Sequence, residues 1–146
     1  MSDLCEGRVC VVTGAARGIG RAHVDALVAA GARVVVNDLD RDAVGHVGDV
    51  SSAPGADGLL GTALDTWGRL DVVANNAGIA RDRMLVNLSE DDWDQVLQVH
   101  LKSTFLVTQR AARHWRAQTK AGEAVDARVV NTVSSVGLYG HVGQSL

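Results

Sequence analysis

The sequence predicts an α/β protein built on a doubly wound sheet of parallel strands. An apolar run at residues 9–12 leads directly into a glycine-rich turn, a helical pattern follows that turn, and a second apolar run follows the helix. The first run shows no alternation of apolar and polar residues, as expected for a parallel strand that is covered on both faces. Strand, turn, helix and strand in this order form the first half of a nucleotide-binding unit.

The elements follow one another with recognisable boundaries. After a strand at residues 8–13, helical spacing predicts a helix that Gly31 ends, and the apolar run 34–36 predicts a second strand that ends at Asp38. A stripe over residues 59–67, closed by Gly68, predicts another helix, and Pro54 suits its first turn or the loop before it. Further strands are expected at 71–74 and 129–133. The first helix is predicted from Ile19, Ala22, Ala26, Leu27 and Ala30.

The longest periodic segment is a helix predicted over residues 91–117. Ser89 is its candidate N-cap, and acidic residues occupy its first turn. Burial within the monomer and packing against a second copy both explain its apolar stripe, which consists of Trp93, Val96, Leu97, Leu101, Thr104, Phe105, Thr108, Ala112 and Trp115.

The turn Thr13-Gly14-Ala15-Ala16-Arg17-Gly18-Ile19-Gly20 carries the strongest chemical signal. A chain that reverses this tightly needs positive φ, and a Cβ would hold a ligand away from the backbone. The helix that follows points its unbonded N–H groups and the positive end of its dipole into the turn. We therefore expect an anion there, most simply a diphosphate, although such a turn also serves merely to join a strand to a helix.

Composition narrows the classes of function. The 146 residues suit one domain, residues 1–146, and 47% apolar residues suffice for a core. A formal net charge of −3 argues against nucleic acid or an anionic membrane as a partner. The first residues are neither basic nor strongly apolar, so we expect no secretory signal and a cytoplasmic location. Cys5 and Cys10 form no disulfide framework, and the histidines show no metal-ligand spacing.

Four ordered motifs together resemble the short-chain dehydrogenase/reductase family. They are the glycine turn, an Asp that closes the second strand (Asp38), Asn75-Asn76-Ala77-Gly78 and a later serine, Ser134. The likeness runs from about Arg8 to the last residue. It implies the N-terminal five strands of a Rossmann-type sheet, and an oxidoreductase that transfers a hydride between a nicotinamide cofactor and a secondary alcohol or ketone.

The resemblance also implies roles for particular residues. Asp49 and Val50 would lie against the adenine, Asn76 would lie next to the cofactor, Ser134 would bond a substrate oxygen, and His100 stands where the family usually has an asparagine of the proton relay. Considered alone, His100 is a core or surface histidine, and Asn76 and Ser134 are turn residues. The segment of Asp49 and Val50 is equally well explained as the N-cap region of a helix, with Ser51 or Ser52 as the cap. The implied cofactor-binding set is Gly14, Arg17, Gly18, Ile19, Gly20, Asp38, Asp49, Val50, Asn76, Ala77 and Gly78.

Two charged residues bear on the choice between NAD and NADP. Asp38 stands where an acid at a strand end accepts hydrogen bonds from both hydroxyls of an adenosine ribose, and its charge would repel a 2′-phosphate. Arg17 argues for NADP, because a cation beside the second glycine can pair with that phosphate. We favour NAD, because the charge of Asp38 would lie directly against the distinguishing group. Asp38 is otherwise an ordinary turn residue.

The sequence departs from the family pattern in two places. Only residues 39–46 separate the second strand from the third, whereas a crossover through a helix needs about a dozen residues or more. The sequence therefore resembles a relative that has lost a helix between about Val44 and Gly45, and we expect an exposed sheet face and a strained or partly disordered connection. The family's Tyr-x-x-x-Lys motif would begin one position after Leu146, and Tyr139 has no lysine four residues later.

Three hypotheses follow. The first is an oxidoreductase, or part of one, that acts on a small alcohol or ketone. The resemblance implies that the tyrosine of the Tyr-x-x-x-Lys motif moves the hydroxyl proton, so without it we expect little activity from these 146 residues. The second is a non-catalytic dinucleotide-binding module. The third is a doubly deleted, barely folded product. In relatives the helix at 91–117 often packs against its copy, so we also expect a homo-oligomer, and we expect the sheet to end in an uncovered edge.

Overall fold

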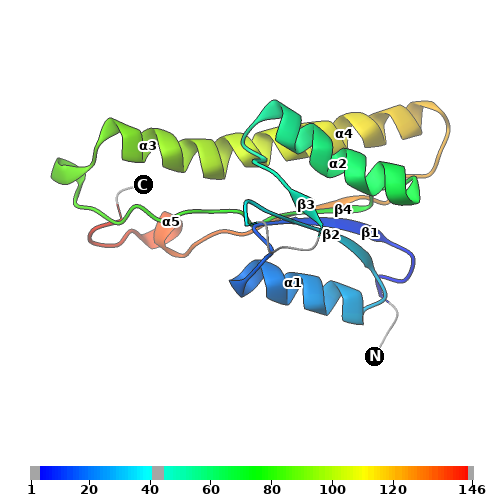
Figure 1. The fold of residues 1–146 in the computed structure, drawn as a ribbon, viewed down its shortest axis with the longest axis horizontal. Helices are drawn as coiled ribbons and strands as arrows, with labels where there is room; N and C mark the ends of the chain where they lie inside the picture. Colours follow the sequence, from blue (N-terminus) through cyan, green and yellow to red (C-terminus); the bar gives the residue numbers. More distant parts are fainter. Residues whose placement is uncertain (1–3, 41–44, 145–146) are drawn as a thin grey trace.

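The computed structural model describes residues 4–40 and 45–144. In these residues five strands form one parallel sheet in the order β3-β2-β1-β4-β5 (Figure 1). The predicted α/β fold, with its doubly wound sheet, is confirmed. The strands are β1 (Val9–Thr13), β2 (Arg33–Asp38), β3 (His46–Val47), β4 (Val72–Asn75) and β5 (Arg128–Asn131).

Helices cover both faces of the sheet. One face carries α1 and the other carries α2 and α4, so that the described elements form three layers (Figure 1). A short 3₁₀ turn and a π-helical turn lie between β4 and α4, and α5 follows β5. The helical elements are α1 (Gly18–Ala29), α2 (Ala53–Trp67), η1 (Leu85–Asn87), α3 (Glu90–Val96), η2 (Leu97–Lys102), α4 (Ser103–Lys120) and α5 (Val136–Tyr139).

β1 lies at the centre of the sheet and supplies the middle of the core. Residues 9–12 have no exposed surface, and alternate side chains join cores on opposite faces. Val9 and Val11 pack with α2 and α4, whereas Val12 packs with α1. Cys10 is buried as predicted, and burial raises the pKa of its thiol to about 12, so it acts as a small hydrophobe.

The connection from β2 to β3 is as short as the sequence predicts. Its residues 41–44, on which part of the predicted deletion falls, lie outside the described residues. Where the chain is described again, β3 pairs with only the last two residues of β2. The buried Asn37 side chain fastens it, because its Nδ2 lies 3.1 Å from the His46 carbonyl and 3.0 Å from the Gly48 carbonyl. Val47 of β3 is 46% exposed, and an exposed sheet face is expected beside this short connection.

β5 forms the other edge of the described sheet. All four of its residues are exposed, and Val130 is 50% exposed, so the predicted uncovered edge is present in the described part of the chain. Asn75 ties this edge to the interior, because its Nδ2 donates to Asn131 Oδ1 and to Thr108 Oγ1 of α4. The structural interpretation of Asn75 therefore agrees with its contacts.

The α1 prediction is right about the helix, but of the residues on which it rests only Leu27 packs against the core. Gly31, at φ +92°, follows the helix end as expected. However, Ala22 and Ala26 are exposed, and the buried positions of α1 are Gly20 and Val24. Ile19 is also exposed, at 63%. Small alanines tolerate either environment, so their spacing does not decide which side of a helix faces the sheet.

The long helix over residues 91–117 is found as three consecutive pieces, α3, η2 and α4. Ser89 caps it as predicted, in a capping box with Asp92. The side of α4 that is buried carries Ser103, Leu106, Val107 and Ala111. Much of the predicted stripe instead faces solvent, so burial within the monomer is wrong for Trp93, Leu97, Leu101 and Phe105. The helix carries two apolar faces, and the predicted stripe mixes residues of both, since Trp115 packs against the core.

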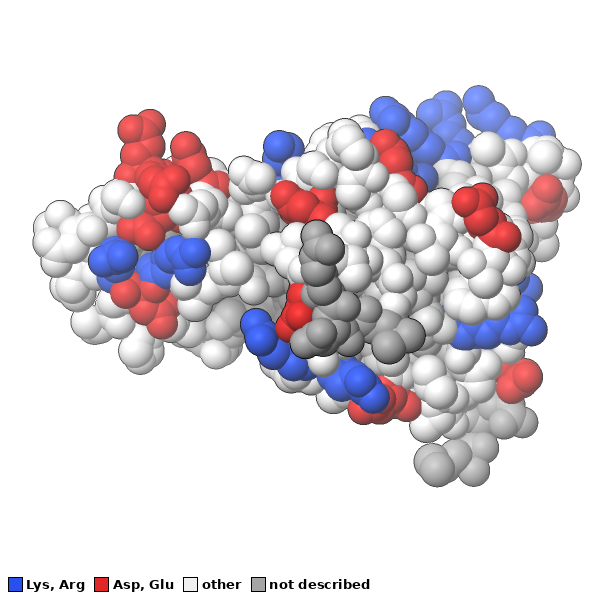
Figure 2. Space-filling model, viewed as in Figure 1, with Lys and Arg blue, Asp and Glu red and all other residues white. Residues whose placement is uncertain are grey.

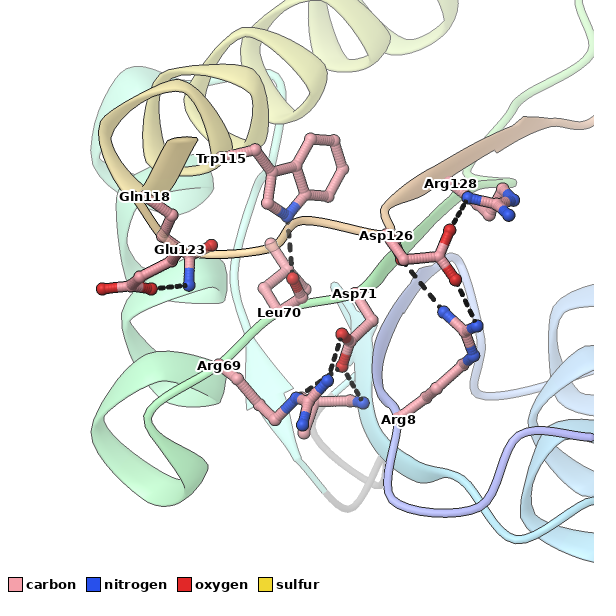
Figure 3. A network of polar contacts seen from close by, with 10 residues as sticks. Arg8, Arg69, Leu70, Asp71, Trp115, Gln118, Glu123, Asp126 and Arg128 are labelled. Atoms are coloured by element: carbon pink, nitrogen blue, oxygen red, sulfur yellow. Dashed lines mark hydrogen bonds and ion pairs between the residues drawn. The ribbon is translucent and has the colours of Figure 1, made fainter. Parts of the chain in front are cut away.

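A network of charged residues fastens the amino ends of β1, β4 and β5 (Figure 3). Asp71 accepts hydrogen bonds from the Val9 amide at 2.7 Å and from Arg69, so it joins β1 to the start of β4. Arg8 and Arg128 both pair with Asp126, which links β1 to β5. This network lies at the ends of the strands opposite to the glycine turn.

The surface carries charges of both signs. Figure 2 shows acidic side chains gathered over α3 and basic ones over the carboxyl-terminal half of α4, which suits the dipole of one long helix. None of the described helices is both long and apolar enough to cross a lipid bilayer.

Candidate functional site

A hollow of about 670 Å³ lies at the carboxyl ends of the strands, where α/β sheets bind ligands. β1 and β4 are neighbours in the sheet but leave it toward opposite faces, which makes this the point where the strand order reverses. Ten of the eleven residues predicted to bind a cofactor line it: Gly14, Arg17, Ile19, Gly20, Asp38, Asp49, Val50, Asn76, Ala77 and Gly78. Gly18 does not line it.

The glycines of the turn bring three backbones together. Gly14 has φ +62°, and a Cβ there would lie 2.7 Å from the Ala77 Cα. A Cβ on Gly20 would lie 2.3 Å from the Gly14 carbonyl oxygen and 2.5 Å from Asn76 Nδ2. Only residues without a side chain allow the start of α1, the end of β1 and the loop after β4 to approach this closely.

The first turn of α1 presents free donors at this place. Arg17 is the N-cap, and no side chain caps the helix or places an acid in its first turn. The leading N–H groups of a helix have no acceptor within the helix, and the helix dipole adds a partial positive charge. Because Gly20 and Ile19 line the hollow, the helix start offers it an anion-binding end.

Asp38 is held at the end of β2 by the glycine turn. Its Oδ2 accepts a hydrogen bond from the Ala16 amide at 3.0 Å, and its Oδ1 accepts one from the Asp40 amide at 3.1 Å. Each carboxylate oxygen accepts more than one hydrogen bond, so both retain capacity for a ligand hydroxyl. The carboxylate is therefore fixed in direction beside the anion-binding end of α1.

Asn76 joins the carboxyl ends of three strands. Its Nδ2 donates to the carbonyls of Thr13 and Gly14, at 3.1 and 3.0 Å, and its Oδ1 accepts from Thr132 Oγ1. Thr13 Oγ1 in turn accepts the amides of Asn76 and Ala77, both at 3.0 Å. Asn76 thus lines the hollow and braces its floor, a double role that its position in a turn motif does not reveal.

Ser134 and His100 line a second hollow of about 410 Å³, which shares Ile79 with the first. His100 lies in η2, and its Nε2 is 2.7 Å from the Ile79 carbonyl oxygen and 3.1 Å from the Ile79 amide nitrogen. Ser134 Oγ accepts the amide of Val136 at 3.2 Å. The two residues predicted to be catalytic therefore share one hollow, and His100 contacts backbone rather than Ser134 itself.

Sequence reasoning missed several residues that shape the site. Ser51 and Gln98 come from distant parts of the chain and meet beside Asp49, and Thr13 bonds the loop after β4. Thr13 directly precedes the glycine turn at a strand end, which is a usable signal. No spacing in the sequence connects Gln98 with Ser51. In the residues that the structure describes, no group of three His, Cys, Asp or Glu side chains could hold a metal ion.

The fold and the hollow define a class. A parallel sheet in this strand order, with a glycine turn and an uncapped helix start at its reversal point, is a Rossmann-type α/β fold with a nucleotide-type site. A family model of short chain dehydrogenases matches residues 8–146. The chain belongs to the short-chain dehydrogenase family, and the resemblance stated from its motifs is confirmed.

Two curated relatives illustrate the likeness. The hydroxyacyl-CoA dehydrogenase ChsB1 of Mycobacterium tuberculosis is 47% identical over 161 residues, which cover 95% of this chain and 50% of that protein. The 3-oxoacyl-[acyl-carrier-protein] reductase FabG of Thermotoga maritima is 35% identical over 157 residues, which cover 96% of this chain and 61% of the reductase.

Two solved structures have the same fold. A short chain dehydrogenase from Mycobacterium avium superposes with a TM-score of 0.91 at 46% identity, covering 95% of this chain and 58% of that one. A 3-ketoacyl-(acyl-carrier-protein) reductase from Brucella melitensis, complexed with NADH, gives a TM-score of 0.86 at 23% identity, over 96% and 62% of the two chains. The second likeness concerns the fold alone.

The chain spans half the length of its Mycobacterium tuberculosis relative. The alignment between them extends over 161 residues, more than the 146 of this chain, so the relative contains residues within the aligned region that have no counterpart here. This agrees with the prediction that a segment is missing inside the chain.

Proposed function

We propose that this chain binds NAD(H) in the hollow at the carboxyl ends of the strands, as the cofactor-binding part of an oxidoreductase. The observation that carries the proposal is the joining of Gly14, Gly20 and the uncapped start of α1 around one space. A diphosphate would suit this space, because amides and a helix dipole can replace its water. The nicotinamide supplies the hydride acceptor or donor.

The arrangement of Asp38 favours NAD over NADP. Its carboxylate is fixed by two backbone amides beside the glycine turn, where both ribose hydroxyls of an adenosine can donate to it. A 2′-phosphate would bring like charges together at the same place. Arg17 lines the same hollow, but it is exposed and its side chain makes no capping hydrogen bond at the helix start, whereas the Asp38 carboxylate is held by two amides.

For the substrate we propose a hydroxyacyl or ketoacyl thioester, a member of the alcohol and ketone class. Support comes from the hydroxyacyl-CoA dehydrogenase that is 47% identical and from the 3-oxoacyl reductase that is 35% identical. In the second hollow, the Ser134 hydroxyl would donate a hydrogen bond to the substrate oxygen. His100 would hold the backbone of Ile79, a residue that lines both hollows.

Proton transfer separates binding from turnover in this proposal. The one tyrosine of the chain, Tyr139, is 86% exposed at the end of α5, and Gly143 stands four residues later instead of a lysine. Moving a hydride to or from an alcohol carbon requires a group that moves the hydroxyl proton. We expect a polypeptide of these 146 residues to bind NADH and to turn over slowly. The lack of a lysine after Tyr139 favours, as the alternative function, a non-catalytic dinucleotide-binding role.

Calorimetric titration with NADH and with NADPH tests the proposal. We expect saturable binding of one NADH per chain with weaker binding of NADPH, and Asp38→Asn should narrow the preference by about tenfold because the repulsive charge is gone. Asp25→Asn, an exposed acid on α1, is the matched control and should leave it unchanged. Absence of binding to either dinucleotide would contradict the proposed function. Turnover of a 3-hydroxyacyl-CoA, followed by NADH absorbance, then separates enzyme from binding module.

A further inference from the structure

A buried hydroxyl connects two side chains that the sequence keeps far apart. Ser51 is 2% exposed, and its Oγ donates to Asp49 Oδ1 at 2.6 Å. Gln98, from η2, places its Nε2 3.0 Å from the same Oγ. Because a carboxylate can only accept, the hydroxyl proton points to Asp49, and the hydroxyl oxygen is left to accept from the glutamine amide. The direction of the whole chain of hydrogen bonds is therefore set.

This chain of bonds leaves one carboxylate oxygen for a ligand. Asp49 Oδ1 also accepts the Ser51 amide at 2.9 Å, so that two donors hold it. Asp49 Oδ2 has no hydrogen-bond partner within the described part of the protein, and Asp49 is an exposed residue that lines the larger hollow. Charge-assisted bonds to one oxygen restrict the rotation of the carboxylate, and they keep the other oxygen in one orientation.

We propose that Ser51 and Gln98 are positioning residues for the adenine end of the cofactor site. They hold Asp49 so that its Oδ2 accepts a hydrogen bond from the exocyclic amine of the adenine. This inference rests on the proposed binding of NAD(H), and it adds a reason for selectivity toward the base. A carboxylate fixed in this way accepts from an amine and repels a carbonyl oxygen, so the site should reject hypoxanthine, which carries a carbonyl at that position.

The bond from Gln98 also has a simpler interpretation, in which it only ties η2 to the loop after β3. The two interpretations differ in a measurable way. A structural tie would affect every ligand of the hollow alike, whereas a positioning role affects the part of the affinity that depends on the adenine amine. Base selectivity therefore separates them.

The test compares three nucleotides on the full 146-residue chain by quenching of tryptophan fluorescence. They are NADH, reduced nicotinamide hypoxanthine dinucleotide, and reduced nicotinamide mononucleotide, which has no base at the adenine end. We expect the unchanged protein to prefer NADH over the hypoxanthine dinucleotide by about tenfold or more, as for a hydrogen bond to a charged group. Ser51→Ala and Gln98→Glu should each reduce this preference at least about threefold. Affinity for the mononucleotide should stay the same.

Ser52→Ala provides the matched control. Ser52 caps α2 and bonds the Asp49 backbone carbonyl at 2.7 Å, so its loss loosens the same segment without touching the Asp49 carboxylate. We expect it to leave the preference intact. An undiminished preference in Ser51→Ala and Gln98→Glu, or an equal loss of affinity for all three nucleotides, would overturn the inference. Failure of the unchanged protein to bind either dinucleotide would overturn the proposed function and the inference with it.

Discussion

At the scale of single residues, the site depends on side chains that are absent as much as on those present. Gly20 lies in the first turn of α1, where its hydrogen faces the Gly14 carbonyl oxygen and the Asn76 amide. This close contact lets the start of α1 approach the end of β1. The free amides of the first turn of α1 therefore lie at the hollow. Asp38 and Asn76 are then fixed by backbone atoms of the same turn.

Replacing Gly20 with alanine should destabilise the protein and weaken binding of NADH. The added Cβ would lie 2.3 Å from a backbone oxygen, so the helix start must move, at a cost of about 1–3 kcal/mol. Gly61→Ala is the matched control, because it also lies within a helix and its Cβ would meet only Asp65 Oδ2, at 3.9 Å. Gly61→Ala should stabilise by about 0.5–1 kcal/mol. Urea unfolding gives both values, and equal stability of Gly20→Ala and the unchanged protein would refute the argument.

Residues of the site were predictable where a short motif carries them. Gly14, Asp38 and Asn76 stand at strand ends, and strand ends can be located from apolar runs. Ser51 and Gln98 were not predictable, because their contact depends on how α3, η2 and α4 lie over the sheet. Local patterns contain no information about such long-range contacts.

At the scale of elements, the helical segment from α3 to α4 carries two apolar faces. One packs on the sheet through Leu106, Val107 and Ala111, and the other exposes Leu101 and Phe105, at 65% and 55%. Between α3 and α4 the π-helical turn η2 adds a residue to the turn and rotates the faces relative to each other. The helix itself was predictable, but neither this turn nor the side that faces the sheet was.

We propose that the exposed face of this helix pairs with its copy in a second chain. Leu101→Glu and Phe105→Glu would place charge in that contact, so we expect each variant to be a monomer under conditions where the unchanged protein is a dimer. Analytical ultracentrifugation measures the difference. Val28→Glu, at an exposed apolar residue of α1, is the control and should leave the dimer intact. Finding the unchanged protein monomeric at all concentrations would refute the proposal.

At the scale of the whole molecule, the two ends of the strands differ: charged pairs hold the amino ends together, and the carboxyl ends are open to ligands. Charged pairs hold the amino ends of β1, β4 and β5, while glycines and amides form the hollow at the carboxyl ends. The strand order was predictable because consecutive strand-helix units in a parallel sheet leave few arrangements. The charged network was not predictable, since Asp71 and Asp126 lie before different strands and carry no motif.

The charged network at the amino ends of the strands makes the free energy of unfolding depend on pH. Burial raises the pKa of Asp71, but hydrogen bonds from Arg69 and the Val9 amide outweigh it and leave the pKa below the ordinary 3.8. A lowered pKa in the folded state means that ionised Asp71 stabilises the protein above about pH 4, and that this contribution is lost as the pH falls through the folded pKa.

Asp71→Asn should therefore lower the free energy of unfolding at neutral pH by about 1–3 kcal/mol, and flatten its fall below about pH 4. Urea unfolding across this pH range measures both effects. Asp25→Asn serves as a control, because Asp25 and its partner Arg21 are both exposed and their pair contributes little. An Asp71→Asn variant with the same acid dependence as the unchanged protein would show that other carboxyl groups govern it.

The central claim is that a dinucleotide lies across the carboxyl ends of the strands with its phosphates at the start of α1. Amide NMR spectra recorded during titration with NADH test it most directly. We expect saturable shifts of the amides of Gly14, Ile19 and Gly20, together with those of Asp49 and Ala77. The amides of the charged network around Asp71, at the other ends of the strands, should change little. Shifts confined to other parts of the chain, or no saturable shift at Ile19 and Gly20, would contradict the account.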